Sequence, residues 1–347
     1  MRKARRFVLV VATLASACAV YFLVLLGVER SGRLLPGDVG SAVGREVEER
    51  GLHFEGTQSC PVDPEFAATI NNTVYGHPIL ELKGSQVLYV SVPKCGSRTF
   101  VWISWALKEA NNISDIITLP YLLKEHTPAE MKLLMDKNFL SSPPRSLFHG
   151  HIRFFPPSSS AVNPVFISII RDPLSRHVSW YYFMRFGDAD MKASELQKEL
   201  SQSAAGINQT YDECVLNNKP DCAWPSYLHM NVMTFCGYEK KCDSPETALE
   251  QAKRNVDNFL FVGIMEEYED SLRVLERLIP TMYRGTSEQY FKNKGEFTSN
   301  SKTAFKKEPS PKAAEIMRER LKYDYEFYYY VRERFHKLKK HLGIGPC

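Results

Sequence analysis

Two short, almost continuous apolar runs constrain the fold of this chain more than any other feature. Residues 86–92 and 165–170 each lead directly into a polar turn and then into a helical pattern. Such strands are typical of a parallel sheet covered on both faces by helices, with ligands bound beyond the carboxyl ends of the strands. The pattern predicts an α/β domain over residues 81–347. Further helices are expected at 246–258, 266–278 and 311–342.

The composition excludes several classes of protein. The 347 residues contain 44 Lys and Arg against 40 Asp and Glu, a net charge of +4 that is too small to indicate a nucleic-acid-binding protein. With 44% hydrophobic and 24% charged residues, the chain is neither disordered nor a multi-span membrane protein. A globular body is therefore expected.

The N-terminus predicts a membrane anchor. Basic residues within 1–6 precede an uncharged apolar segment, 7–28, which is long enough to cross a hydrocarbon core of ~30 Å. The charge distribution predicts a cytoplasmic tail (1–6), a type II signal anchor (7–28) and a lumenal stem (29–80). A cleaved signal peptide is the alternative, because Ala15-Ser16-Ala17 resembles a cleavage site, but the apolar run continues well beyond it. Three glycosylation sequons agree with a lumenal body, at Asn71, Asn112 and Asn208.

The cysteines also indicate an oxidising compartment. Cys214 lies close to Cys222 in the sequence, and Cys236 lies close to Cys242, as suits two local disulfides. A zinc site is the alternative, although neither spacing is the C-x2-C of a zinc ribbon. Cys95 is expected to remain a free thiol. Cys60 and Cys347 have no obvious partner.

The loop after the first apolar run has the composition of an anion site. It reads Pro93-Lys94-Cys95-Gly96-Ser97-Arg98-Thr99 and precedes the helical stretch 100–108. A helix N-terminus offers main-chain N–H groups and a positive dipole end to an anion, and Lys94 adds a charge. The pattern is not a Walker A loop, which disfavours a magnesium-dependent nucleotide hydrolase or kinase. An ordinary strand–helix turn with a solvated lysine is the alternative.

A second candidate anion site follows the second apolar run. Asp172 as N-cap and Pro173 at the first helical position predict a helix start. The planar guanidinium of Arg171 suits a phosphate, and Ser179 on the following helix offers a hydroxyl to the same group. A carboxylate partner for Arg171 is the alternative. Two such sites on one sheet fit a ligand with phosphates at both ends.

His149 and His151 lie between these two segments and are candidate general bases. In a strand-like stretch the two side chains point to the same side, so both are expected near one site. A neutral imidazole titrates near pH ~6.5, which suits proton abstraction in a mildly acidic lumen. A structural or metal-binding pair of histidines is the alternative.

Together these motifs resemble the two phosphosulfate-binding segments of the uronyl 2-O-sulfotransferase family, which includes the heparan sulfate 2-O-sulfotransferases. The resemblance covers residues 85–343 and includes the Arg185-Phe186-Gly187-Asp188 motif, the run 261–264, the cysteine spacings and the aromatic tail 323–328. It implies a P-loop-like sulfotransferase fold with a central parallel sheet, a Golgi membrane location and, as an allowed assembly, a homotrimer.

The resemblance also implies roles for particular residues. The sulfate donor is expected to be 3′-phosphoadenosine 5′-phosphosulfate (PAPS), with no metal. Residues 94–99 are expected to hold its 5′-phosphosulfate, and Arg171 and Ser179 its 3′-phosphate. His151 is the expected catalytic base, His149 a supporting residue, and Lys94 the cation that stabilises the leaving oxygen. A polar loop is expected to cover the nucleotide through Tyr290, Thr298, Thr303 and Lys306.

The expected acceptor is the 2-hydroxyl of uronic acid residues in a glycosaminoglycan, with chondroitin or dermatan favoured over heparan. Val90-Ser91 replaces an Asn-Arg pair that the family commonly carries, a departure that concerns the acceptor. The alternatives are a sulfotransferase for another sugar hydroxyl and an inactive glycosaminoglycan-binding protein. The candidate contacts to the acidic polymer are Arg98, Arg153 and Arg185, and a basic C-terminal face adds Arg332, Arg334, Lys337, Lys339 and Lys340 unless that face is merely solvated.

Overall fold

The computed structural model describes residues 86–120, 127–156, 163–192, 207–223 and 228–345, all within the compact unit Gln58–Cys347. The predicted tail, anchor and stem, together with Asn71, Cys60 and Cys347, lie outside the described residues. Among the helices of the described segments, none has the length and apolarity needed to cross a membrane.

The described segments form a parallel sheet in the order β2-β3-β1-β4-β5. Every residue of β1, β4 and β5 is buried, as the two continuous apolar runs predict for strands covered on both faces. The predicted α/β fold is confirmed. The strands are β1 (Val87–Val90), β2 (Ile116–Thr118), β3 (Leu147–Gly150), β4 (Val165–Ile170) and β5 (Phe259–Ile264).

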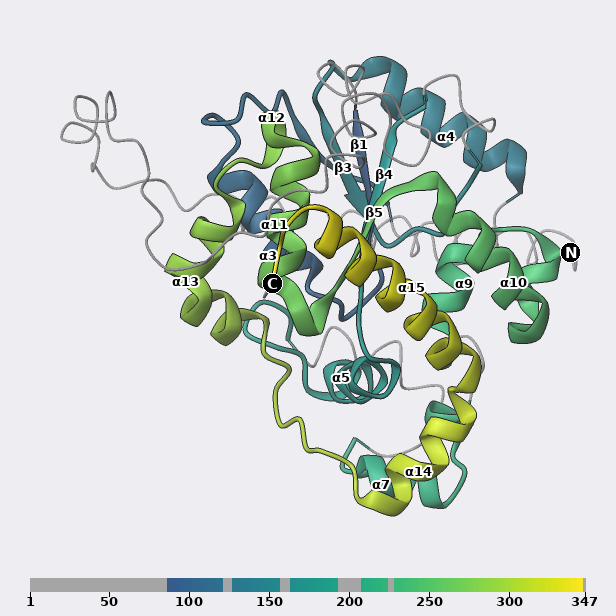
Figure 1. The fold of residues 1–347 in the computed structure, drawn as a ribbon. Coiled ribbons are helices and arrows are strands. Elements are labelled where there is room, and N and C mark those ends of the chain that lie inside the picture. Colours follow the sequence, from purple (N-terminus) through teal and green to yellow (C-terminus); the bar gives the residue numbers. More distant parts are fainter. Residues whose placement is uncertain (1–85, 121–126, 157–162, 193–206, 224–227, 346–347) are drawn as a thin grey trace, which may run out of the picture. The chain divides into compact units, whose positions relative to one another are not determined.

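Two groups of helices enclose the sheet (Figure 1). One group contains α3 (Ser97–Ala106), α11 (Tyr268–Leu278), α12 (Pro280–Tyr283) and α13 (Thr286–Ser301). The other contains α9 (Met230–Cys236), α10 (Pro245–Asn255) and α15 (Lys322–His341). Helix α5 (Pro173–Phe186) lies beyond the carboxyl end of β4 (Figure 1). The remaining α-helices of the described segments are α4 (Pro128–Ser141), α7 (Tyr211–Leu216) and α14 (Pro311–Arg320).

Aromatic side chains fill much of the core between the sheet and these helices. Phe166 of β4 and Phe259 of β5 have ring centroids 5.6 Å apart, and Phe235 of α9 lies 4.8 Å from Phe259. Phe139 of α4 meets Phe148 of β3 edge-on at 4.6 Å. Such pairs add to the stability that burial of their large apolar surfaces supplies. The packing fixes the strand ends that carry the candidate site residues.

Two expectations about local structure are wrong. The predicted helix over 311–342 is two helices, α14 and α15, separated at Leu321, whose φ is −92° and ψ is 11°. The two helices pack on different elements, because α14 packs on α7 whereas α15 packs on β5 and α9. The expected polar loop around 290–298 lies within helix α13. Tyr290 and Phe297 stack on one face of this helix, and its polar residues are largely exposed.

Both predicted disulfides are present, Cys214–Cys222 and Cys236–Cys242. The second joins the end of α9 to the short 3-10 helix Lys240–Asp243. Asn112 and Asn208, the described sequon asparagines, are exposed at the surface. Their glycosylation remains a prediction.

Candidate functional site

The strand order brings the predicted site residues to one edge of the sheet. Strand β1 is paired with β3 on one flank and with β4 on the other. All three strands are parallel, so the segments that follow them leave the sheet at the same edge. These segments carry Lys94 after β1, His151 after β3 and Arg171 after β4.

The loop after β1 forms a backbone cradle at the start of α3. Lys94 and Gly96 both have positive φ, 66° and 80°, which turns the chain sharply into the helix. The first main-chain bond of the helix runs from Phe100 N–H to Gly96 O, at 3.2 Å. The N–H groups of residues 97–99 therefore precede the helical ladder and point outward at the positive end of the helix dipole. This is the arrangement predicted for an anion site.

Gly96 cannot be replaced without disturbing this cradle. A Cβ atom at its position would lie 2.6 Å from the Sδ atom of Met265, and its left-handed backbone disfavours any side chain. The Tyr268 hydroxyl donates a hydrogen bond to Gly96 O at 3.1 Å. The loop is thus held from behind by residues that follow β5.

The two predicted phosphate segments are directly connected. Arg171 Nη1 donates a hydrogen bond to Lys94 O at 3.2 Å. The predicted helix start is confirmed, because the Asp172 side chain accepts from Ser175 N–H at 2.8 Å and Pro173 is the first helical residue. Further along α5, the Ser179 hydroxyl lies 3.1 Å from the Thr303 hydroxyl. Two residues expected to contact the nucleotide from different segments therefore meet.

The Lys94 ammonium lies in a largely enclosed environment. Its Nζ atom is 3.8 Å from the centroid of the Phe183 ring and 3.9 Å from Asp188 Oδ2. Burial lowers the pKa of Lys94 to about 8, against the opposing effect of the Asp188 carboxylate and with Arg98 and Arg171 adding to the decrease. The group is a cation at neutral pH that is poorly hydrated, as an anion-binding lysine should be.

His151 has the geometry of a general base. Its Nδ1 atom lies 2.9 Å from Ser91 O, and because a carbonyl oxygen only accepts, Nδ1 carries the proton. The lone pair of the neutral ring is then on Nε2. Burial lowers the pKa of His151 against the opposing effect of the hydrogen bond to Ser91 O, and the nearby charges of Lys94 and Arg98 lower it further, which favours the neutral ring.

His149 and His151 have different hydrogen-bond partners. The last residue of β3 is Gly150, so His151 lies just beyond the strand, whereas the His149 Nε2 atom lies 3.0 Å from the Thr118 hydroxyl of β2. Burial lowers the pKa of His149 to about 4, with a smaller effect of His151. His151 is the histidine whose pKa is lowered by the charges of Lys94 and Arg98.

The three candidate polymer contacts have different surroundings. Arg98 is partly exposed and lies 2.9 Å from Asp188 Oδ2 and 3.1 Å from Asp190 Oδ2. Arg185 has 2% of its side chain exposed, forms an ion pair with Asp221 at 2.5 Å and stacks on the Tyr181 ring. Arg153 is buried, and its Nη1 atom donates to Gly237 O at 3.4 Å. Of the three, only Arg98 is partly exposed, and it belongs to the loop at 94–99.

The other predicted residues are spread more widely. Tyr290 packs against Tyr268, with ring centroids 5.0 Å apart. Because Tyr268 donates a hydrogen bond to Gly96 O, it connects Tyr290 to the loop at 94–99. Thr298 is exposed on α13, and Lys306 pairs with Glu308 at 2.9 Å. Cys95 is a free, buried thiol, as predicted, and burial raises its pKa to about 12.

The predicted basic C-terminal face is largely neutralised by carboxylates. Arg334 pairs with Asp257, Lys337 with Glu333, and Lys339 with Glu267 and Asp270. Arg332 instead lies over the rings of Tyr328 and Tyr329. Because most of its charges are paired, this face is a weaker polymer surface than the sequence suggests.

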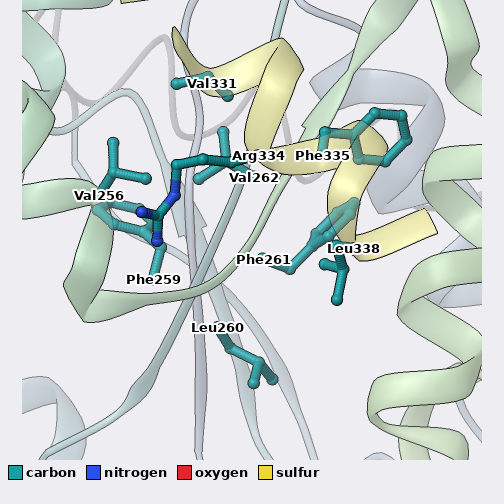
Figure 2. Close-up of a pocket in the computed structure, with 9 residues that line it drawn as sticks. All are labelled: Val256, Phe259, Leu260, Phe261, Val262, Val331, Arg334, Phe335 and Leu338. Carbon is teal, nitrogen blue, oxygen red and sulfur yellow. The ribbon is translucent and has the colours of Figure 1, made fainter. Parts of the chain in front are cut away.

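A small pocket between β5 and α15 is not the candidate site. Figure 2 shows that apolar side chains and Arg334 line it, and the residues of the two phosphate segments take no part. Within the described segments, no three His, Cys, Asp or Glu side chains come together as they would around a metal ion.

Comparisons with known proteins decide the family. The profile of the Sulfotransferase family matches residues 81–331, which includes all three strand-end segments. The chain belongs to the sulfotransferase family. This confirms the resemblance seen in its motifs.

Two groups of relatives resemble this sulfotransferase over most of its length. The uronyl 2-sulfotransferase of Mus musculus is 38% identical over 264 residues, which cover 75% of this chain and 64% of the relative. The heparan sulfate 2-O-sulfotransferase 1 of Xenopus laevis is 31% identical over 264 residues, which cover 74% of this chain and 72% of the relative. The sulfotransferase thus spans less than two thirds of the uronyl relative that it matches.

Sequence reasoning missed several residues that shape the site of this sulfotransferase. Phe183 lies beneath Lys94, Tyr268 fixes Gly96, and the Glu266 carboxylate accepts the Asp172 N–H at 3.0 Å. Aromatic residues and glutamates of helices carry no spacing signal that separates these contacts from ordinary packing. Asp188 was part of a recognised motif, but nothing in the sequence indicated that its carboxylate faces Lys94 and Arg98.

Proposed function

We propose that this sulfotransferase moves the sulfuryl group of PAPS to the 2-hydroxyl of uronic acid residues in a glycosaminoglycan. The observation that carries the proposal is the meeting of Lys94, Arg171 and His151 at one sheet edge, with the first two joined by a hydrogen bond. Two cations and a neutral base are the groups that sulfuryl transfer from an anionic nucleotide requires.

The donor residues fit an anionic nucleotide. The cradle at 94–99 offers main-chain N–H groups, an ammonium and the Arg98 guanidinium to an anion. Arg171, Ser179 and Thr303 lie along the neighbouring segment and suit the 3′-phosphate. The proposal also assigns Tyr290, Thr298 and Lys306 to the nucleotide.

The proposed reaction is a single displacement at sulfur. The acceptor hydroxyl oxygen forms a bond to sulfur while the bond between sulfur and the bridging phosphate oxygen breaks, and that oxygen keeps the electron pair. His151 takes the hydroxyl proton on Nε2, and Lys94 stabilises the charge on the departing phosphate. Because Nδ1 is held by Ser91 O, the ring presents Nε2 in a fixed direction.

The acceptor class rests on the relatives and on Arg98. Relatives named uronyl 2-sulfotransferase and heparan sulfate 2-O-sulfotransferase support an acidic polysaccharide as the acceptor. Arg98 is partly exposed and belongs to the loop at 94–99, so it is the residue proposed to contact this polymer. Arg185 and Arg153, which are buried, are assigned structural roles instead.

The proposed setting is the Golgi membrane. A tail (1–6), an anchor (7–28) and a stem (29–80) would hold the catalytic domain (81–347) in the lumen, and the two disulfides agree with that oxidising compartment. A homotrimer is the assembly expected for this proposal. Size-exclusion chromatography with light scattering on the purified full chain tests the assembly.

One experiment separates the proposed function from its alternatives. The purified full chain is incubated with radiolabelled PAPS and separate samples of dermatan, chondroitin and heparan sulfate, and the products are analysed as disaccharides. The proposal predicts label on the 2-hydroxyl of uronic acid, highest with dermatan or chondroitin. Label on a galactose or hexosamine would contradict the acceptor. Polymer binding without transfer would indicate a binding protein that lacks activity.

A further inference from the structure

We propose that Asp188 is a positioning residue that holds the Lys94 ammonium and the Arg98 guanidinium where the donor's phosphosulfate binds. The inference rests on the proposed function and adds to it an anionic residue in a site otherwise recognised by its cations. Asp188 belongs to the turn after α5, far in sequence from the loop that it contacts.

The two carboxylate oxygens of Asp188 have separate partners. Oδ1 accepts the N–H groups of Asp190 at 3.2 Å and Met191 at 3.1 Å, within its own turn. Oδ2 lies 2.9 Å from Arg98 Nη1 and 3.9 Å from Lys94 Nζ. One oxygen thus fixes the carboxylate to its turn, and the other faces both cations of the donor loop.

The turn itself is anchored on two sides. Gly187 N–H donates to Phe183 O at 2.8 Å, which closes the end of α5, and Gly187 O accepts the N–H of Ala304 at 3.0 Å. Gly187 also forms an antiparallel bridge with Lys192. A carboxylate on so restrained a turn can hold a flexible lysine, whose Nζ is confined between this carboxylate and the Phe183 ring.

The burial of Asp188 makes its charge effective. Its side chain is 1% exposed, so solvent screens the interaction with Lys94 weakly. Arg98, Arg171 and His151 also face Lys94, and each disfavours its protonation when charged, while the Cys95 thiol contributes the opposite way only if ionised. Asp188 is therefore the anion that keeps this enclosed ammonium charged, and a charged ammonium is the form that binds phosphate.

Asp190 provides a matched control on the same turn. Its side chain is 41% exposed and contacts Arg98 at 3.1 Å, and it has no ion pair with Lys94. Asp190→Asn removes one negative charge from the turn, as Asp188→Asn does. Only Asp188→Asn removes the charge that faces Lys94.

The experiment measures binding of 3′-phosphoadenosine 5′-phosphate (PAP), the desulfated product, to the full chain by calorimetry between pH 7 and 9.5. Over this range the phosphates are ionised, and loss of affinity reports deprotonation of Lys94. The unchanged chain and Asp190→Asn should share one midpoint. Asp188→Asn should lose affinity at a pH lower by about one unit, and hence bind about fivefold more weakly at the original midpoint and about tenfold more weakly well above it.

Each outcome has a defined meaning. An equal loss of PAP affinity at every pH, or no loss, would assign Asp188 a purely structural role and overturn the inference. No PAP binding by the unchanged chain would overturn the proposed function itself. If Asp188→Asn does not fold, Asp188→Glu keeps the charge and extends it toward Lys94, so its midpoint must be at or above that of the unchanged chain. A lower midpoint would contradict the inference.

Discussion

The Arg171 guanidinium donates a hydrogen bond to the main-chain oxygen of Lys94, 3.2 Å away. This bond connects the segments that follow two adjacent strands, β1 and β4. Because a main-chain oxygen is the acceptor, the contact depends on the path of the loop rather than on the lysine side chain. Arg171 therefore shapes the loop at 94–99, in addition to its proposed role as a cation for the 3′-phosphate.

Replacement of Lys94 should weaken donor binding without unfolding the chain. A hydrogen bond between a charged donor and a phosphate contributes about 1.5–3 kcal/mol, so Lys94→Ala should weaken PAP binding by roughly 10- to 150-fold. Calorimetry measures the affinity. Lys137→Ala, an exposed lysine on α4, is the matched control and should bind PAP as the unchanged chain does. Unchanged PAP affinity in Lys94→Ala would show that the loop at 94–99 does not bind the donor.

Replacement of His151 should affect chemistry and spare donor binding. Loss of a general base typically lowers kcat by 10²- to 10⁴-fold, and His151→Ala should do so while its PAP affinity stays within about threefold. His149→Gln keeps a polar group near Thr118 and should lower kcat by less than about tenfold. A larger loss of kcat in His149→Gln than in His151→Ala would show that His149, and not His151, is the base.

The pH dependence of the unchanged enzyme follows from the lowered pKa of His151. The neutral ring is the active form, so kcat should rise with pH through a pKa below the ordinary value of ~6.5 and stay level above it. The measurement is kcat with saturating donor and acceptor from pH 4.5 to 7.5. A rise centred above pH 7 would show that another group is the base.

Arg185 is expected to act on stability and not on the acceptor. Its guanidinium pairs with Asp221 and is almost fully buried, so Arg185→Ala leaves a carboxylate without its partner at a cost of about 3 kcal/mol. Urea unfolding measures this loss, and Arg254→Ala, at an exposed site, should change stability by less than about 0.5 kcal/mol. The KM for the polymer should change less than about twofold. A large change in the KM for the polymer in folded Arg185→Ala would show that Arg185 contacts the acceptor.

Asp324 should make stability depend on pH. It is buried and accepts the N–H groups of Asn231 and Val232, and burial raises its pKa to about 6. A raised native pKa stabilises the fold fully below the unfolded value of about 3.9, and this stabilisation is lost as pH rises through about 6. The difference in unfolding free energy between the unchanged chain and Asp324→Asn should therefore decrease as the pH rises from 4 to 7. Asp243→Asn, at an exposed site, should show no such trend.

The parts of the fold and site that follow from local rules could be predicted from the sequence. Continuous apolar runs indicate buried parallel strands, and β4 has the predicted bounds. Asp172 and Pro173 mark a helix start by local chemistry alone, and the short cysteine spacings suffice for both disulfides. Loops after parallel strands converge by topology, which is why Lys94, Arg171 and His151 could be grouped in advance.

Features that depend on tertiary packing could not be predicted. The break at Leu321 involves neither proline nor glycine and arises because α14 and α15 pack on different elements. Arg185 has the same sequence character as Arg98, and only the fold shows that Asp221 neutralises it. The helical form of 290–298 depends on Tyr290 and Phe297 packing inward, a spacing that reads equally well as a polar loop with scattered aromatics.

The position of β1 between β3 and β4 has a consequence for protein engineering. The residues proposed to bind the nucleotide follow β1 and β4, whereas the proposed proton acceptor, His151, follows β3. A chimera that exchanges the β2–β3 half with that of a relative should therefore change the surroundings of the proposed proton acceptor and leave the residues proposed to bind the donor in place.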